Sequence, residues 1–153
     1  MTSALERPHV LIISADLDLT GFLGEGLIYA GFWTSVIADA LQALEVFRLR
    51  SFDIILLDAT LGGIGAAEFV QRLRGRSDRA PASPRSDIPL VVIAASTDEI
   101  PPHLRQGDDP AAILLAPLDI PDIATVLLQT VLAWKQAHPD RPWADAAADG
   151  DAS

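Results

Sequence analysis

Residues 53–58 form a short apolar run that ends in a carboxylate, Asp58. Such a run predicts a buried strand, and ligands collect at the carboxyl ends of strands in an open parallel sheet. A phosphate-handling site at this edge would need acids, a hydroxyl and a cation at the neighbouring strand ends. The sequence places other side chains there: Ser14, Ala15, Ala94 and Ala116. Asp58 is therefore a candidate site residue whose expected chemical partners are mostly missing.

Five short aliphatic or β-branched runs recur along the chain and predict strands that are buried on both faces. They cover residues 10–14, 34–37, 54–57, 90–94 and 113–115. Segments with helical spacing lie between and after them, at residues 19–30, 39–47, 65–74, 97–107 and 119–135. Asp39 is the expected N-cap of the second helix, and the Pro101-Pro102 pair leaves room for only a short fourth helix. Alternating strands and helices predict right-handed βαβ units and a parallel sheet.

Composition restricts the class of protein. The 153 residues are enough for one domain, and half of them are hydrophobic. The net charge of −10 argues against general affinity for nucleic acid or for an anionic membrane. The chain has no cysteine, which excludes disulfides and thiolate metal sites. The apolar run near the N-terminus is too short for a signal peptide or a membrane span, so we expect a cytoplasmic protein.

Two segments lie outside the alternating pattern. Residues 75–87 form a Pro/Ser/Arg-rich loop, and residues 136–153 are expected to form a flexible acidic tail with Trp143 as its one large apolar side chain. We therefore predict a domain over residues 8–135 and no appended output domain. Five arginines gather near the loop, at positions 72, 74, 76, 79 and 85. They form either a solvated helix end with a mobile loop, which we favour, or an edge that contacts an anion or nucleic acid.

Several motifs resemble the receiver domain of bacterial two-component response regulators, over about residues 8–135. They are the acid that ends the strand at Asp58, the Gly31-Phe32 turn, the run that begins Ile88-Pro89, and the Ala116-Pro117-Leu118-Asp119 junction. The resemblance implies a flavodoxin-like (CheY-like) α/β fold. In that fold a doubly wound, five-stranded parallel sheet has the strand order 2-1-3-4-5, with helices on both faces.

The family's chemistry is implied by the same resemblance. A kinase histidine donates a phosphoryl group to the aspartate that matches Asp58, and an Mg²⁺ ion held by two acids offsets the charge. Those acids match Ser14 and Ala15, the family's hydroxyl matches Ala94 and its lysine matches Ala116. Asp16 is one residue out of register, and successive residues of a strand point to opposite faces, so it is not a simple replacement. Only the phospho-acceptor position, Asp58, is retained.

We therefore predict a stand-alone, degenerate receiver domain, or pseudo-receiver, that is a protein-interaction module in phosphorelay signalling and not an enzyme. Its partners would be a histidine kinase, a phosphotransfer protein or another signalling protein, with no nucleic acid and no membrane. A homodimer could use the face formed by residues 97–107, 113–115 and 119–135. No cofactor is expected.

Two alternatives stay open. In the first, Asp58 is a working phospho-acceptor, with Mg²⁺ bound by Asp16 and Asp58. In the second, the pocket over Ala15, Ala94 and Ala116, emptied of charged side chains, binds a small molecule.

Overall fold

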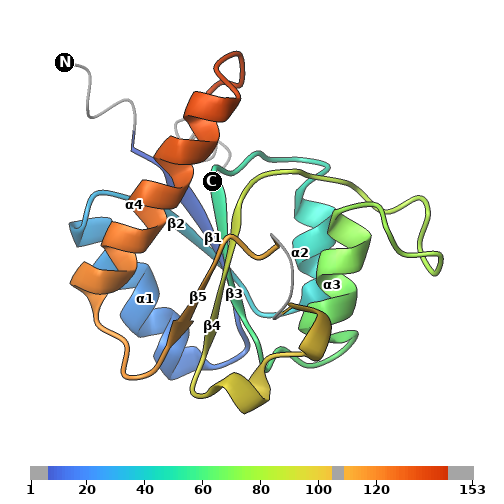
Figure 1. Cartoon of the computed structure of the whole chain (residues 1–153), viewed down its shortest axis with the longest axis horizontal. Helices are drawn as coiled ribbons and strands as arrows, with labels where there is room; N and C mark the ends of the chain where they lie inside the picture. The colour runs from blue at the N-terminus through green and yellow to red at the C-terminus, as the bar shows by residue number, and fades with distance from the viewer. Residues whose placement is uncertain (1–6, 105–108, 145–153) are drawn as a thin grey trace.

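The computed structural model describes residues 7–104 and 109–144. Five parallel strands form one sheet in the order β2-β1-β3-β4-β5, and Figure 1 shows α1 and α4 on one face of this sheet and α2 and α3 on the other. The strands are β1 (His9–Ile13), β2 (Trp33–Ile37), β3 (Ile54–Asp58), β4 (Leu90–Ala94) and β5 (Ala112–Leu115). The α-helices are α1 (Leu17–Tyr29), α2 (Ala40–Val46), α3 (Gly65–Leu73) and α4 (Ile120–Ala137). The predicted fold class and strand order are confirmed.

The two faces of the sheet carry separate apolar layers. Leu11, Ile55 and Val92 pack against α2 and α3, whereas Val10, Leu56 and Val91 pack against α1 and α4. This division follows from the pleat, which sends alternate side chains to opposite faces. Every residue of β1, β3 and β4 is buried. The prediction of burial on both faces is wrong for β2 and β5, which are partly exposed because they lie at the sheet edges.

Three helices begin at an aspartate. The side chains of Asp16, Asp39 and Asp119 accept hydrogen bonds from backbone N–H groups in the first turns of α1, α2 and α4. These caps satisfy donors that have no partner within the helix. The cap predicted at Asp39 is confirmed.

The fourth predicted helix is wrong. Over residues 97–104 the chain forms two short 3₁₀ segments, η2 (Thr97–Glu99) and η3 (Pro102–Leu104), and residues 105–108 lie outside the described part. The Pro101-Pro102 pair interrupts the backbone hydrogen bonds that a longer helix would need. Ile100 and Leu104 nevertheless reach the core, so these turns cover the same face as a helix would.

The segment after residue 135 differs from the flexible tail that we expected. Helix α4 continues to Ala137, and residues 138–144 then contact the domain. Arg141 forms a bidentate ion pair with Asp87 at 2.6 and 2.9 Å, and the Ala144 N–H donates to Asp53 Oδ1 at 3.0 Å. Trp143 packs against the apolar layer under α1 and α4. The residues after 144 lie outside the described part.

The irregular loop at residues 75–87 is present as predicted. Within the described ranges, none of the helices combines the length and the apolar character needed to cross a bilayer.

Candidate functional site

The predicted site residues meet at the carboxyl edge of the sheet. Asp58 ends β3, Ala94 ends β4, and Ser14 and Ala116 directly follow β1 and β5. A cavity of about 230 Å³ opens there, and its lining includes Asp16, Asp58, Thr60, Ala94, Glu99 and Ala116. Ala15 is exposed and is not among the lining residues. Parallel strands thus bring together residues that are up to about a hundred positions apart in the sequence.

Asp58 is 8% exposed, and both of its carboxylate oxygens accept hydrogen bonds. The Ser14 hydroxyl donates to Oδ2 at 2.6 Å, and Thr60 donates to Oδ1 through its N–H at 2.9 Å and its hydroxyl at 2.7 Å. Ser14 is 1% exposed and also accepts the Asp16 N–H at 3.1 Å. Ser14 therefore joins the end of β1 to the carboxylate, and Asp58 is held in one orientation by neutral donors.

Asp16 is the N-cap residue of α1. Its Oδ1 accepts the Leu19 N–H at 3.2 Å and caps α1. A capping carboxylate is oriented toward the helix terminus, which restricts how it can serve a ligand in the cavity.

The cavity has a negative electrostatic character. Asp16, Asp58 and Glu99 line it, and its other lining residues are apolar except for Thr60. Glu99 lies in η2 and accepts the Ala95 N–H at 2.7 Å. None of the described lining residues carries a positive charge. An anion that entered this cavity would meet carboxylates without a compensating cation.

Comparison with known proteins agrees with this geometry. No model of a known family matches the chain. The chain is 32% identical over 94 residues to the DNA-binding response regulator MtrA of Mycolicibacterium paratuberculosis; the match covers 61% of this chain and 38% of MtrA. The chain thus spans well under half the length of this relative.

Solved structures extend the comparison to the fold. A sensor protein from Polaromonas sp. JS666 is 26% identical, with a TM-score of 0.66 over 82% of this chain and 96% of the other. A CheY-like receiver domain from Methylobacillus flagellatus superposes with a TM-score of 0.64 at 19% identity, over 81% of this chain and 98% of the other. The chain has the CheY-like receiver fold, and its sequence relatives are response regulators. Receiver domains are signalling modules.

The receiver fold implies a magnesium site, and the described residues fit one poorly. They include no group of three His, Cys, Asp or Glu side chains that could hold a metal. The two weak candidates, Asp16 and Asp58, line the same cavity, but both already accept hydrogen bonds from the protein. Selective Mg²⁺ sites require near-octahedral oxygen coordination, which two engaged carboxylates do not supply.

Sequence reasoning missed two residues of this receiver site. Thr60 lies two residues after Asp58, a spacing at which aspartate commonly accepts the backbone N–H in a turn. Glu99 follows β4 by five residues, and only its contact with Ala95 places it over the cavity. The first residue had a local signal in the sequence, whereas the second depends on the path of the loop.

Proposed function

We propose that this receiver domain is a pseudo-receiver, which signals through protein contacts and does not depend on phosphorylation of Asp58. The observation that carries the proposal is the cavity beside Asp58, whose described lining has three carboxylates and no positively charged residue. The cytoplasmic location stays a prediction.

Electrostatics supports the proposal. Phosphoryl transfer spreads negative charge over the phosphoryl oxygens, and catalysis of this transfer depends on cations or hydrogen-bond donors placed in advance. Here the hydroxyls of Ser14 and Thr60 already donate to the acceptor carboxylate. At the positions that match the family's hydroxyl and lysine, Ala94 and Ala116 offer neither a donor nor a charge on their side chains.

The proposed partner surface lies on β5 and α4. Ile113 and Leu115 of β5 and Leu128 and Leu132 of α4 are each about 40% exposed. Apolar side chains at a sheet edge and on the adjoining helix suit a protein interface. The partner would be a histidine kinase, a phosphotransfer protein, another signalling protein or a second copy of this chain. The predicted fourth helix is replaced here by the turns η2 and η3.

Intact-mass measurement with acetyl phosphate and Mg²⁺ tests the independence from phosphorylation. We expect no added phosphoryl mass in the wild-type protein and the same result in Asp58→Ala. A mass gain in the wild type that is absent from Asp58→Ala would contradict the proposal and support the phospho-acceptor alternative. Beryllofluoride with Mg²⁺, followed by NMR at Thr60 and Ala95, provides a second readout that needs no covalent step.

Sedimentation tests the interaction role separately. The molecular mass in solution, measured over a range of concentrations, should not change on addition of acetyl phosphate. The double variant Leu128→Ser/Leu132→Ser should remove any self-association, whereas Leu41→Ser, which changes an exposed leucine on α2, should not. Association that appears only with acetyl phosphate would contradict a constitutive interaction surface.

The small-molecule alternative at this cavity has little support. The volume of about 230 Å³ is below the range of about 300–1,000 Å³ that is usual for ligand pockets.

A further inference from the structure

A larger cavity lies at the opposite, amino edge of the sheet. It has a volume of about 700 Å³ and opens beside Phe52 and Ile88, which precede β3 and β4. Its walls also come from the end of α3, the loop at residues 75–87, the end of α4 and residues 141–144. A cavity of this size is within the usual range for a small ligand.

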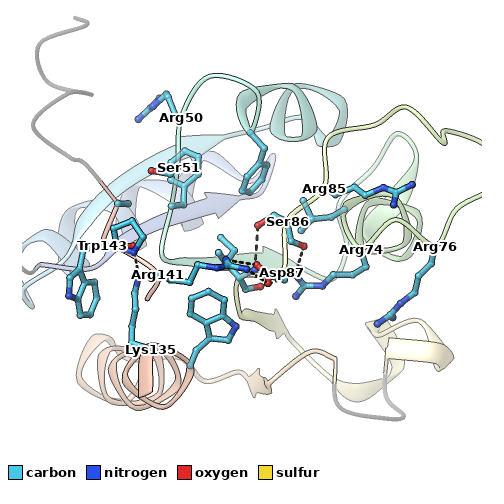
Figure 2. A pocket seen from close by; sticks show the side chains of 17 residues that line it. Arg50, Ser51, Arg74, Arg76, Arg85, Ser86, Asp87, Lys135, Arg141 and Trp143 are labelled. Carbon is cyan, nitrogen blue, oxygen red and sulfur yellow. Dashed lines mark hydrogen bonds and ion pairs between the residues drawn. The ribbon is translucent and has the colours of Figure 1, made fainter. Parts of the chain in front are cut away.

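The cavity is strongly basic in an acidic protein. Six of the chain's eleven lysines and arginines line it, and Asp87 is its only carboxylate among the described lining residues. The six are Arg50, Arg74, Arg76, Arg85, Lys135 and Arg141. Figure 2 shows Arg74, Arg76 and Arg85 on one side of this pocket and Lys135 and Trp143 on the other, with Arg141 and Asp87 between them. Such clustering in a chain of net charge −10 requires an explanation.

Between described residues, three of the six cations form ion pairs with carboxylates. Arg74 pairs with Asp109 at 2.8 Å, Lys135 with Asp53 at 3.1 Å and Arg141 with Asp87 at 2.6 Å. These pairs connect residues 74, 135 and 141 of the cavity wall to residues 109, 53 and 87.

Arg76 and Arg85 differ from those three cations. Neither side chain has a hydrogen bond or an ion pair with any described residue, although both line the cavity. The Arg85 side chain lies on the backbone at Gly75, where an added Cβ would come within 2.7 Å of its Nε. Glycine at this position, with φ of +72°, therefore lets the arginine pack closely against the turn. The two guanidinium groups provide unneutralised positive charge at one end of the cavity.

Besides its basic side chains, the cavity has aromatic rings in its walls. Trp134, Trp143, Phe47 and Phe52 all line it. Trp134 also lines an adjoining cavity of about 310 Å³ together with Arg74 and Arg76, so an indole and two guanidinium groups adjoin the same space. The Trp134 ring already stacks on His138, with the ring centroids 4.1 Å apart. The remaining aromatic surface next to the guanidinium groups suits a ligand with a ring at one end and phosphate groups at the other.

We propose that this amino-edge cavity binds a phosphorylated nucleotide, with the phosphates on Arg76 and Arg85 and the base against Trp134. Inorganic pyrophosphate carries the same phosphoanion as a nucleotide but has no base, so it can occupy only the arginine end of the cavity. The proposal does not depend on the state of Asp58, because the two cavities lie at opposite edges of the sheet.

Isothermal titration at low ionic strength with ADP, GDP, adenosine and pyrophosphate tests the proposal. We expect one molecule of ADP or GDP to bind per chain, with weaker binding of pyrophosphate and little of adenosine. Arg76→Ala and Arg85→Ala should each lower the affinity about tenfold, because each removes a charge-assisted hydrogen bond. The affinity should fall with added salt. Both residues are exposed and have no described partner, so these variants should stay folded.

Arg79→Ala is the matched control, since Arg79 lies in the same loop and does not line the cavity. An equal loss in Arg79→Ala would show non-specific attraction and overturn the site. Failure of both nucleotides to bind would overturn the proposal entirely. In NMR, the Trp134 indole N–H should shift with ADP and hardly at all with pyrophosphate. Equal affinities for ADP and pyrophosphate, without a Trp134 shift, would overturn the nucleotide assignment.

Discussion

The two edges of the sheet carry opposite charge. At the carboxyl edge, three carboxylates line a cavity of about 230 Å³, and at the amino edge, six basic side chains line one of about 700 Å³. At the edge that carries chemistry in the receiver family, none of the described lining residues is basic. The opposite edge has the positive charge and the volume that such an anion needs. The same sheet thus carries an acidic cavity at one edge and a basic cavity at the other.

The two edges also differ in how they are held together. At the carboxyl edge, neutral hydroxyls of Ser14 and Thr60 hold Asp58. At the amino edge, Asp53 is 1% exposed, accepts the His9 N–H at 2.8 Å and the Ala144 N–H at 3.0 Å, and pairs with Lys135. The amino edge thus depends on buried charge, whereas the carboxyl edge depends on neutral donors.

Restoring a cation at the carboxyl edge should have the largest effect. Ala116→Lys places an ammonium beside Asp58, where it can stabilise the charge that develops on a phosphoryl group. We expect an Asp58-dependent mass gain from acetyl phosphate that the wild type does not show, because a single preorganised donor accelerates such a step by about 10²–10³-fold. Gln42→Lys on α2 adds the same charge away from the cavity and should have no effect. An unchanged rate in Ala116→Lys would mean that the missing cation is not what limits Asp58.

Removing the buried carboxylate at the amino edge should have the next largest effect. Asp53→Ala leaves Lys135 unpaired with its side chain only 13% exposed, so we expect a loss of about 3 kcal/mol in the free energy of unfolding. Urea denaturation measures this loss. The double variant Asp53→Ala/Lys135→Met should recover much of it, because no unpaired charge remains. Asp98→Ala, at an exposed position, should change the free energy by less than about 0.5 kcal/mol. A loss no larger than this control would contradict the role of the buried pair.

Acidification should have the smallest effect, confined to residues 138–144. The hydrogen bond from Arg141 lowers the pKa of the Asp87 carboxyl below its ordinary value of 3.8. The contribution of this ion pair to the attachment is therefore complete above that value and is lost as the pH falls through the lowered pKa of the folded state. Both side chains are about half exposed, so solvent screening keeps the contribution small.

NMR of the Ala144 amide between pH 7 and pH 3 measures this release. The readout must be local, because the pKa of Glu68 is also lowered, by hydrogen bonds from Arg72 and Ser77, and this carboxyl titrates on α3. Arg141→Gln should remove the part of this pH response that comes from Asp87, while the contacts of Trp143 and Ala144 remain. The same titration curve in Arg141→Gln and in the wild type would contradict the assignment to Asp87.

Much of the fold could be predicted from local pattern. The apolar runs that became β1, β3 and β4 have no polar alternation, which marks strands covered on both faces. Asp39 identified the start of α2 by its capping chemistry. The prediction of burial failed for strands whose exposure depends on their position in the sheet. β2 and β5 resemble the central strands in composition, and only their edge positions expose them.

The residues of the candidate site were predictable to a similar extent. Alternation of strands and helices placed Ser14, Asp58, Ala94 and Ala116 at one edge. Glu99 was missed because a loop's path depends on the prolines and on the burial of Ile100, not on local periodicity. The segment at 138–144 was misjudged because its polar composition resembles a solvated tail, although Asp53, Asp87 and the apolar layer near Trp143 hold it.

By itself, the sequence determined the parallel sheet, the position of Asp58 and the absence of its charged partners. These follow from hydrophobic periodicity and from residue identity, which are local properties of the chain. The tertiary structure alone decided that Arg50, Arg74, Arg85 and Lys135, separated by up to 85 positions, line one cavity around two tryptophans. Charges so far apart in the sequence interact only after the core has packed. In the unfolded chain they are separated by more than a Debye length, so water and dissolved ions screen them.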